Sequence, residues 1–221
     1  MVCIELRQVT FQYERGKRIF ENISIKIEKD ETTALLGPNG SGKTTLGKLM
    51  VGVLRPSKGQ VYIFNKDSSK MAISEIGSKI GYLFQNPEKQ FFTNSVYEEL
   101  SFVLRTKKYH EDYIKEKVDK ILNTFQLQGL ERQAPFLLSQ GEKKRLALAA
   151  ILINKPDYLI LDEPTLGLDG RRKEILLDTL SKLKKQGIGM TIISHDDNFV
   201  KAIGDRLIGL SRGEIVYDQR T

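Results

Sequence analysis

Residues 37–44 constrain this chain more than any other segment. They read Gly-Pro-Asn-Gly-Ser-Gly-Lys-Thr and fill every fixed position of the phosphate-loop pattern GxxxxGKS/T. In such a loop the glycines let successive backbone N–H groups face one anion, and the following helix adds its positive N-terminal end. The apolar run at 33–36 predicts a strand before the loop, and residues 46–50 predict a helix after it. A glycine-rich turn of chance origin would lack that context, so the segment predicts a nucleotide site.

The residue types of this loop indicate their roles at a nucleotide. Lys43 can reach the β- and γ-phosphates, and the hydroxyl of Thr44 can bind a Mg2+ ion that bridges them. We therefore expect ATP and Mg2+ as cofactors. The predicted nucleotide-binding residues of the segment are Gly37, Pro38, Asn39, Gly40, Ser41, Gly42, Lys43, Thr44 and Thr45.

The composition is that of a water-soluble globular domain. The 221 residues are 40% hydrophobic and 29% charged, which suits one domain or one domain with an inserted lobe. The net charge of +7 permits a nucleic acid, an anionic membrane surface or an acidic ligand as partner. The basic residues are scattered and no aromatic-interleaved basic stripe occurs, so we expect no nucleic acid. The single cysteine, Cys3, excludes a disulfide within the chain and is expected to be a strand residue.

Neither a membrane span nor an export signal is expected. No apolar run approaches the length that crosses a bilayer. The first residues lack a charged region followed by an apolar one, so we predict no secretory signal and a location at the cytoplasmic face of the cell membrane.

The order of patterns along the chain predicts one domain, residues 1–221, with an insertion. Alternating residues at 3–13 and 23–27 predict a small antiparallel sheet near the N-terminus. Helical periodicity dominates residues 86–155, which we expect to form a helical subdomain. The segments 1–85 and 156–221 would then form the nucleotide-binding α/β core with its β subdomain.

Two adjacent carboxylates follow a second apolar strand, at residues 158–161. Ligands of α/β sheets bind at the carboxyl ends of the strands, which is where Asp162 and Glu163 are expected. Asp162 is placed to hold Mg2+ through water, and Glu163 to orient or deprotonate a water that attacks the γ-phosphate. The alternative is an ordinary solvated turn at a strand end.

Residues 138–142, Leu-Ser-Gln-Gly-Glu, resemble the LSGGQ signature of ATP-binding cassette (ABC) ATPases. Other marks of that family follow the expected order along essentially the whole chain. They are Tyr13 as the adenine-stacking aromatic, Gln85 as the Q-loop, Asp169 in the D-loop and His195 as the switch histidine. The resemblance implies an α/β phosphate-loop NTPase core of the RecA type, an N-terminal antiparallel β subdomain and an inserted α-helical subdomain.

The resemblance also implies roles for individual residues. The catalytic set is Lys43, Gln85, Glu163 and His195, and the metal-binding set is Thr44, Gln85 and Asp162. The signature and D-loop residues, which contact the ATP of the opposite subunit, are Ser139, Gln140, Gly141, Glu142 and Asp169. Gln140 and Glu142 depart from the usual glycine and glutamine, which places nucleotide affinity or dimer closure in doubt.

Plainer alternatives remain at several of these positions. Ser139 to Glu142 satisfies the S-x-x-E capping box and starts a helix whether or not it touches nucleotide. Tyr13 could be a packed aromatic beside Phe11. Gln85 could be an ordinary loop amide, and His195 an ordinary loop histidine.

One phosphate loop and one signature cannot complete two composite sites, so a second ABC ATPase subunit, identical or different, is expected. Transport would also require separate transmembrane subunits. Residues 85–92 and 95–100 look like the QNPxxQ-type segment of energy-coupling factor importers, which take up vitamins, cobalt and nickel. In that family residues 85–97 would meet the transmembrane component, with Phe91 and Phe92 as exposed contacts and Gln90 at their polar edge. Both rings could instead pack inside the helical subdomain.

Family members often carry an extra C-terminal segment, and the sequence here ends soon after its last predicted hairpin. The alternatives are a cassette of another importer or exporter class, or a soluble ABC ATPase such as an iron-sulfur assembly factor. The transported substrate is not encoded in these residues.

Overall fold

A six-stranded sheet forms the centre of the computed structural model, which describes residues 1–14 and 16–221. The strand order is β10-β9-β3-β8-β7-β6, and all neighbours are parallel except β9 and β10. The strands are β3 (Thr32–Leu36), β6 (Ile80–Leu83), β7 (Tyr158–Asp162), β8 (Met190–Ile193), β9 (Arg206–Ser211) and β10 (Glu214–Arg220). Together with the helices below, this sheet confirms the expected α/β class.

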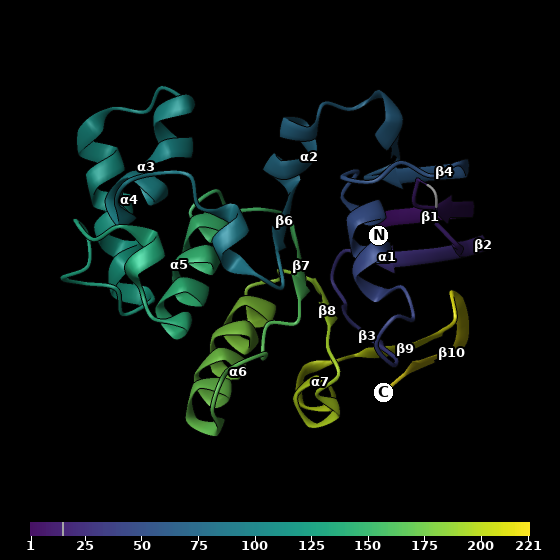
Figure 1. Cartoon of the computed structure of the whole chain (residues 1–221). Coiled ribbons are helices and arrows are strands. Elements are labelled where there is room, and N and C mark those ends of the chain that lie inside the picture. Colours follow the sequence, from purple (N-terminus) through teal and green to yellow (C-terminus); the bar gives the residue numbers. More distant parts are fainter. Residues whose placement is uncertain (15) are drawn as a thin grey trace.

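A second, antiparallel sheet has the order β2-β1-β4-β5. Its strands are β1 (Val2–Gln12), β2 (Arg18–Glu28), β4 (Lys58–Ile63) and β5 (Lys66–Asp67). The helix α1 (Lys43–Met50) lies between this sheet and the central one, as Figure 1 shows. The expected N-terminal sheet is therefore present, with a second strand that is longer than the sequence pattern suggested.

The remaining helices are η1 (Ser68–Lys70), α2 (Ile73–Lys79), η2 (Pro87–Gln90), α3 (Val96–Thr106), α4 (Glu111–Thr124), η3 (Pro135–Leu137), α5 (Gln140–Leu152), α6 (Gly170–Lys185) and α7 (Asp197–Ile203). Of these helices, η1 and α2 lie on the α1 side next to β4 and β6, and the others lie on the opposite side of the central sheet or beyond its β6 edge (Figure 1). The sequence pattern did not predict α2 or α7. Each spans only seven residues, too few for an apolar face to repeat clearly.

Strand β7 is buried along its whole length, which explains its continuous apolar sequence. Leu159 and Leu161 face the core shared with the helical layers, whereas Tyr158 and Ile160 face the core around α1. Because the flanking strands run parallel to β7, the carboxyl ends of β3, β7 and β8 meet at one edge of the sheet. The phosphate loop, Glu163 and His195 all follow these ends.

Two glycines of the phosphate loop are required by its close approach to other segments. Gly37 has φ +148°, and a Cβ there would lie 2.1 Å from the carbonyl oxygen of Leu210. Gly42, which precedes α1, has φ +107°, and a Cβ there would lie 2.7 Å from the ring of Phe20. Both positions combine a left-handed backbone with no room for a side chain.

The segment after β6 corrects one prediction. Phe91 is only 6% exposed and belongs to the core that the helices share with the central sheet, so the expectation that it is a surface contact is wrong. Phe92 is 62% exposed and packs edge-on against Phe102, with ring centroids 4.6 Å apart. The amide of Gln90 accepts from the backbone N–H of Phe84 and donates to the carbonyl of Tyr82, so it ties this segment to β6 while it also lines a groove together with Phe92.

Substituting the two phenylalanines separately should give different losses of stability. Phe91→Ala should lower the free energy of unfolding by about 3–5 kcal/mol, because it leaves a cavity in a packed core. Phe92→Ala should lower it by about 1 kcal/mol, because it removes mainly one exposed aromatic contact. Urea denaturation followed by circular dichroism measures both, and equal losses would contradict the assignment of Phe91 to the core.

Candidate active site

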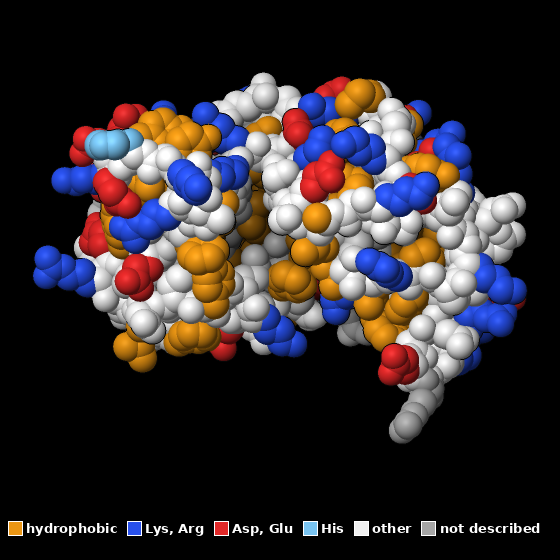
Figure 2. Space-filling model, turned by 90° about the horizontal axis from the view of Figure 1, so that it is seen from above, with side chains coloured by type: hydrophobic (Ala, Val, Ile, Leu, Met, Phe, Trp, Pro, Cys, Tyr) orange, Lys and Arg blue, Asp and Glu red, His pale blue; other side chains and the backbone are white. Residues whose placement is uncertain are grey.

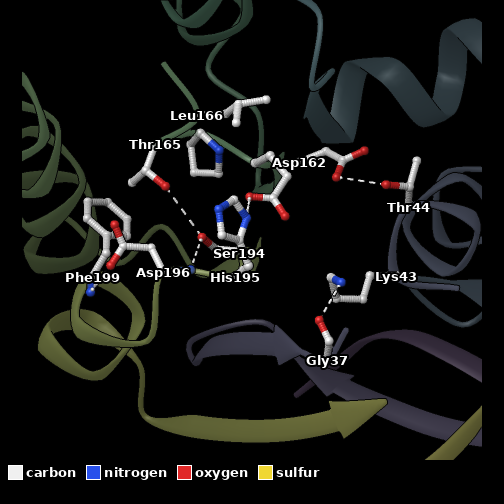
Figure 3. Close-up of polar contacts among 12 residues, drawn as sticks. Gly37, Lys43, Thr44, Asp162, Thr165, Leu166, Ser194, His195, Asp196 and Phe199 are labelled. Atoms are coloured by element: carbon white, nitrogen blue, oxygen red, sulfur yellow. Dashed lines mark hydrogen bonds and ion pairs between the residues drawn. The ribbon is translucent and has the colours of Figure 1, made fainter. Parts of the chain in front are cut away.

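The phosphate loop forms the floor of a cleft of about 380 Å³ at the carboxyl edge of the central sheet. The cleft is lined by Ile19, Asn39, Gly40, Gly42, Lys43, Thr44, Thr45, Gln85 and Glu163. Lys43 is buried, and its Nζ donates to the carbonyl oxygen of Gly37 at 2.7 Å (Figure 3). It also donates to the carbonyl oxygen of Pro38 at 3.0 Å. The loop therefore gathers a cation, two hydroxyls and glycine backbone on one side of a cleft, which suits a polyphosphate.

Asp162 joins β7 to the phosphate loop. Its Oδ1 accepts a hydrogen bond from Thr44 Oγ1 at 3.0 Å, and its Oδ2 accepts one from the Tyr82 hydroxyl at 3.3 Å. Burial raises the pKa of Asp162, and the two hydroxyl donors offset part of that shift. A threonine hydroxyl beside a carboxylate provides hard oxygen ligands of the kind that Mg2+ prefers.

Glu163 and His195 form a pair across two neighbouring strand ends. His195 Nδ1 lies 2.9 Å from Glu163 Oε2, and the histidine is 57% exposed while the glutamate is 8% exposed. The backbone of Glu163 has φ +50°, and its N–H donates to the carbonyl of Ile193 at the end of β8. An unusual backbone conformation thus turns this carboxylate from the strand toward the cleft.

The loop that carries His195 is fixed by its neighbours. The N–H of Asp196 donates to Ser194 Oγ at 3.0 Å, and the Asp196 carboxylate caps α7 by accepting from the N–H of Phe199 (Figure 3). Lys173 Nζ lies 2.6 Å from Asp196 and lowers the pKa of that carboxyl group. The turn that carries His195 is therefore held in place by hydrogen bonds and an ion pair of its neighbours.

Tyr13 and Gln85 lie at the rim of the same region. The Tyr13 hydroxyl is 3.1 Å from Thr45 Oγ1, and its ring meets Phe11 edge-on at 4.9 Å. Tyr13 is nevertheless 41% exposed, so packing against Phe11 leaves part of its surface open. Gln85 is exposed and lines the cleft, as expected for a residue that faces a nucleotide.

The signature and D-loop residues form a separate group. Ser139 and Glu142 make both bonds of a capping box at the start of α5, and Asp169 caps α6 by accepting from the N–H of Arg172. The part of the chain that the structure describes places none of Ser139, Gln140, Gly141, Glu142 or Asp169 in the lining of the phosphate-loop cleft. The capping box holds the Glu142 carboxylate at Ser139, which lowers the pKa of Glu142.

Sequence patterns missed two residues of this region. One is Tyr82, which reaches Asp162 from the adjacent strand β6. The other is Lys144, which is 8% exposed and donates to the carbonyl oxygens of Glu163 at 3.5 Å, Pro164 at 3.1 Å and Leu166. The helical periodicity could have indicated Lys144. It lies three positions before residue 147 and four before residue 148, so it shares the helix face of these two apolar residues.

Comparison with known proteins agrees with this geometry. The sequence profile described as ABC transporter matches residues 20–166, about two thirds of the chain. The chain belongs to this ABC transporter family. It is therefore an ATP-binding subunit and an ATPase of the ABC class, and ABC ATPases form dimers that work with membrane subunits.

Individual relatives cover most of this ABC ATPase. A putative ABC transporter ATP-binding protein of Pyrococcus horikoshii is 39% identical over 97% of the chain and 82% of the relative. The energy-coupling factor transporter ATP-binding protein EcfA of Methanothermobacter thermautotrophicus is 38% identical over 97% of the chain and 70% of the relative.

Solved structures of cassettes match the fold as a whole. CbiO1 of Clostridium perfringens, described as part of the ABC transporter complex CbiONQ, has a TM-score of 0.87 at 33% identity, covering 99% of this chain and 88% of that one. A dimeric cassette in a post-hydrolysis state with ADP and phosphate has a TM-score of 0.88 at 27% identity, covering 98% of both chains.

None of the helices in the described residues is long and apolar enough to span a membrane.

The buried lysine of this site predicts a pH dependence of stability. Burial lowers the pKa of Lys144 to about 8, whereas an unfolded lysine titrates near 10.4. Between these values the unfolded chain binds more protons, so the free energy of unfolding should rise with pH. The free energy of unfolding of the wild type, measured relative to that of Lys144→Met, should rise by up to roughly 3 kcal/mol across this pH window. Below the window the difference between the two proteins should not change with pH. Urea denaturation at several pH values measures the difference, and a flat difference would contradict the burial of a charged lysine.

Proposed function

We propose that this chain is the ATP-hydrolysing subunit of an energy-coupling factor importer for a vitamin or a metal ion. The observation that carries the catalytic part is the Glu163–His195 pair at the rim of the phosphate-loop cleft. The similarity to EcfA and to CbiO1, a part of a CbiONQ complex, supports the importer class. In this function the chain sits peripherally at the cytoplasmic face of the membrane.

ATP would bind with its phosphates along the loop of residues 37–44. Lys43 is then the cation for the β- and γ-phosphates, and the backbone N–H groups and the start of α1 supply further donors. Tyr13 would contact adenine with the part of its ring that Phe11 leaves exposed. Thr45 supports that tyrosine through its hydroxyl.

The residues present fit a Mg2+ ion, because Thr44 Oγ1 and Asp162 lie 3.0 Å apart beside the loop. Thr44, Asp162 and Gln85 would hold it, directly or through water. When bound, the ion offsets phosphate charge and orients the γ-phosphate. Tyr82 keeps Asp162 oriented through its second oxygen.

Hydrolysis requires a water that attacks the γ-phosphate in line. Glu163 would orient this water and accept its proton, and His195 would fix the glutamate and contact the phosphate. Gln85 reaches the cleft from the end of β6 and can complete the water site. The short distance between Glu163 and His195 supports their joint role.

Each complete site would combine the phosphate loop of one subunit with the signature of another. Ser139, Gln140, Gly141 and Glu142 lie at the N-terminus of α5, where backbone N–H groups suit an anion, and Asp169 would lie at the interface. Their separation from the loop of their own chain supports this arrangement. The dimeric form of a structural relative supports it further.

A groove of about 280 Å³ is the proposed docking site for the transmembrane subunit. Figure 2 shows hydrophobic side chains gathered in a hollow between the helical subdomain and the rest of the molecule. Its lining comes from the end of α1, from α2, β6, η2, α3 and α5, and it includes Phe92 and Val53, which are 62% and 49% exposed. Because Phe92 belongs to the segment at residues 85–97, this groove supports the expected contact with a cytoplasmic helix of the membrane component.

Replacing the proposed general base should abolish turnover without abolishing nucleotide binding. Glu163→Gln keeps the side-chain volume but cannot accept the proton, so kcat should fall by about 10²–10⁴-fold. Lys43→Ala should instead weaken ATP binding, because it removes a charge at the phosphates. Phosphate release and equilibrium ATP binding measure the two effects.

The same Glu163→Gln variant tests the composite site, because trapped ATP should convert it from monomer to dimer in size-exclusion chromatography. The wild type without nucleotide is the control. A variant that hydrolyses ATP at the wild-type rate would remove Glu163 from the mechanism. A monomer that hydrolyses ATP fully would remove the composite site.

Shortening the exposed apolar residues of the groove should disrupt assembly with the transmembrane component. Burial of one phenylalanine is worth roughly 1.5–3 kcal/mol, so Phe92→Ala combined with Val53→Ala should weaken the complex at least tenfold. ATP binding should be unchanged. Val216→Ala is a matched control, because Val216 is 59% exposed on β10 and lies outside the groove. Co-purification from membranes measures assembly, and retention by the double variant equal to the control would rule out this docking site.

A further inference from the structure

Helix α5, which begins at the signature, also contacts the turn at residues 163–166 of its own subunit, the catalytic turn, which carries Glu163. Lys144 lies in the second turn of α5, and its Nζ donates to the carbonyl oxygens of Glu163, Pro164 and Leu166. These carbonyls belong to the segment that immediately follows β7. One side chain thus connects α5 to the backbone of the residue that faces the cleft.

The catalytic turn needs such a connection because its backbone is strained. Glu163 has φ +50°, a conformation that residues other than glycine, asparagine and aspartate rarely adopt. The N–H of Glu163 is held by Ile193 on the sheet side. On the opposite side the Glu163 carbonyl accepts from the N–H of Leu166, and Lys144 bonds to the turn, more closely at Pro164 and Leu166 than at Glu163 itself.

A cavity of about 70 Å³ lies beside this contact, lined by Lys144, Leu148, Pro164, Leu168 and α6 residues such as Leu176. Leu148 and Leu176 also belong to the buried core, and Leu168 packs against it. Apolar packing and the hydrogen bonds of Lys144 therefore act together in placing α5 against the turn, and the lysine supplies the polar part of that connection.

We propose that Lys144 is a positioning residue for Glu163, and that it links the signature end of α5 to the catalytic turn of the same subunit. This inference rests on the proposed function, in which the signature meets the nucleotide of a partner subunit. A shift of α5 caused by that contact would move the lysine that is bonded to the carbonyl oxygens of Glu163, Pro164 and Leu166. Closure of the dimer would then adjust the position of the Glu163 carboxylate relative to the γ-phosphate.

Removing the ammonium group should slow the chemistry and spare binding. Lys144→Met preserves chain length and apolar packing but has no donor for the three carbonyls. We expect kcat for ATP hydrolysis to fall at least tenfold. KM and equilibrium ATP binding should stay within about twofold of the wild type. ATP-driven pairing, measured in a double variant that also carries Glu163→Gln, should stay within about twofold of that of Glu163→Gln alone. Lys144→Arg should remain within about threefold of wild-type kcat, because it keeps the donors and the adjacent cavity gives it room.

Lys184→Met is the matched control. Lys184 also donates to a backbone carbonyl, that of Ile203 at 2.8 Å, but it ties α6 to the end of α7 and lies outside the phosphate-loop cleft. Its loss should leave kcat within twofold of the wild type. A role of Lys144 in folding alone would lower stability and ATP binding without the selective loss of kcat.

The inference is overturned if Lys144→Met turns over ATP as fast as Lys184→Met, or if its loss of activity is matched by an equal loss of ATP binding. If Lys144→Met does not fold, the same comparison is made with Lys144→Gln, which keeps a shorter neutral donor and should show an intermediate kcat. Failure of the wild type itself to hydrolyse ATP would instead refute the proposed function. The two failures are therefore distinguishable.

Discussion

The site depends on one buried carboxylate that is anchored from two directions. Asp162 ends a strand whose five residues are all buried, and an unpartnered charge there would be costly. Thr44 and Tyr82 each donate a hydroxyl to it, the first from the phosphate loop and the second from the neighbouring strand. These two bonds make the carboxylate tolerable in the interior and fix the loop against the sheet. The junction thus holds Thr44 and the start of α1 beside the end of β7.

Most of the predictable structure lies in motifs whose residues are adjacent in the sequence. The loop at residues 37–44 and the apolar strand before Asp162 specify their own local structure, because their glycines and buried strand residues act within a few positions of one another. The parallel order of β3, β7 and β8 then brings segments far apart in sequence to one edge. The capping box at Ser139 was likewise predictable, since both of its bonds join residues three positions apart.

What the sequence could not predict depends on contacts between distant segments. Phe91 and Phe92 are adjacent and chemically identical, and only the packing of the helical subdomain decides that the first is buried and the second exposed. Tyr82 reaches Asp162 through strand pairing, across 80 positions of sequence. Lys144 is one of a run of basic residues, and its burial depends on where the turn after β7 passes α5.

The residue beside that lysine contacts a different segment. Lys143 is buried, and its Nζ lies 2.5 Å from the carboxylate of Glu88 in η2, which Gln140 also contacts at 3.4 Å. The first turns of α5 are therefore bonded by one lysine to η2, which contributes Gln90 to the lining of the apolar groove, and by the next lysine to the turn after β7. In the proposed function, a partner docked in this groove would contact a segment tied to the same helix that holds the backbone beside Glu163, at a place outside the nucleotide cleft.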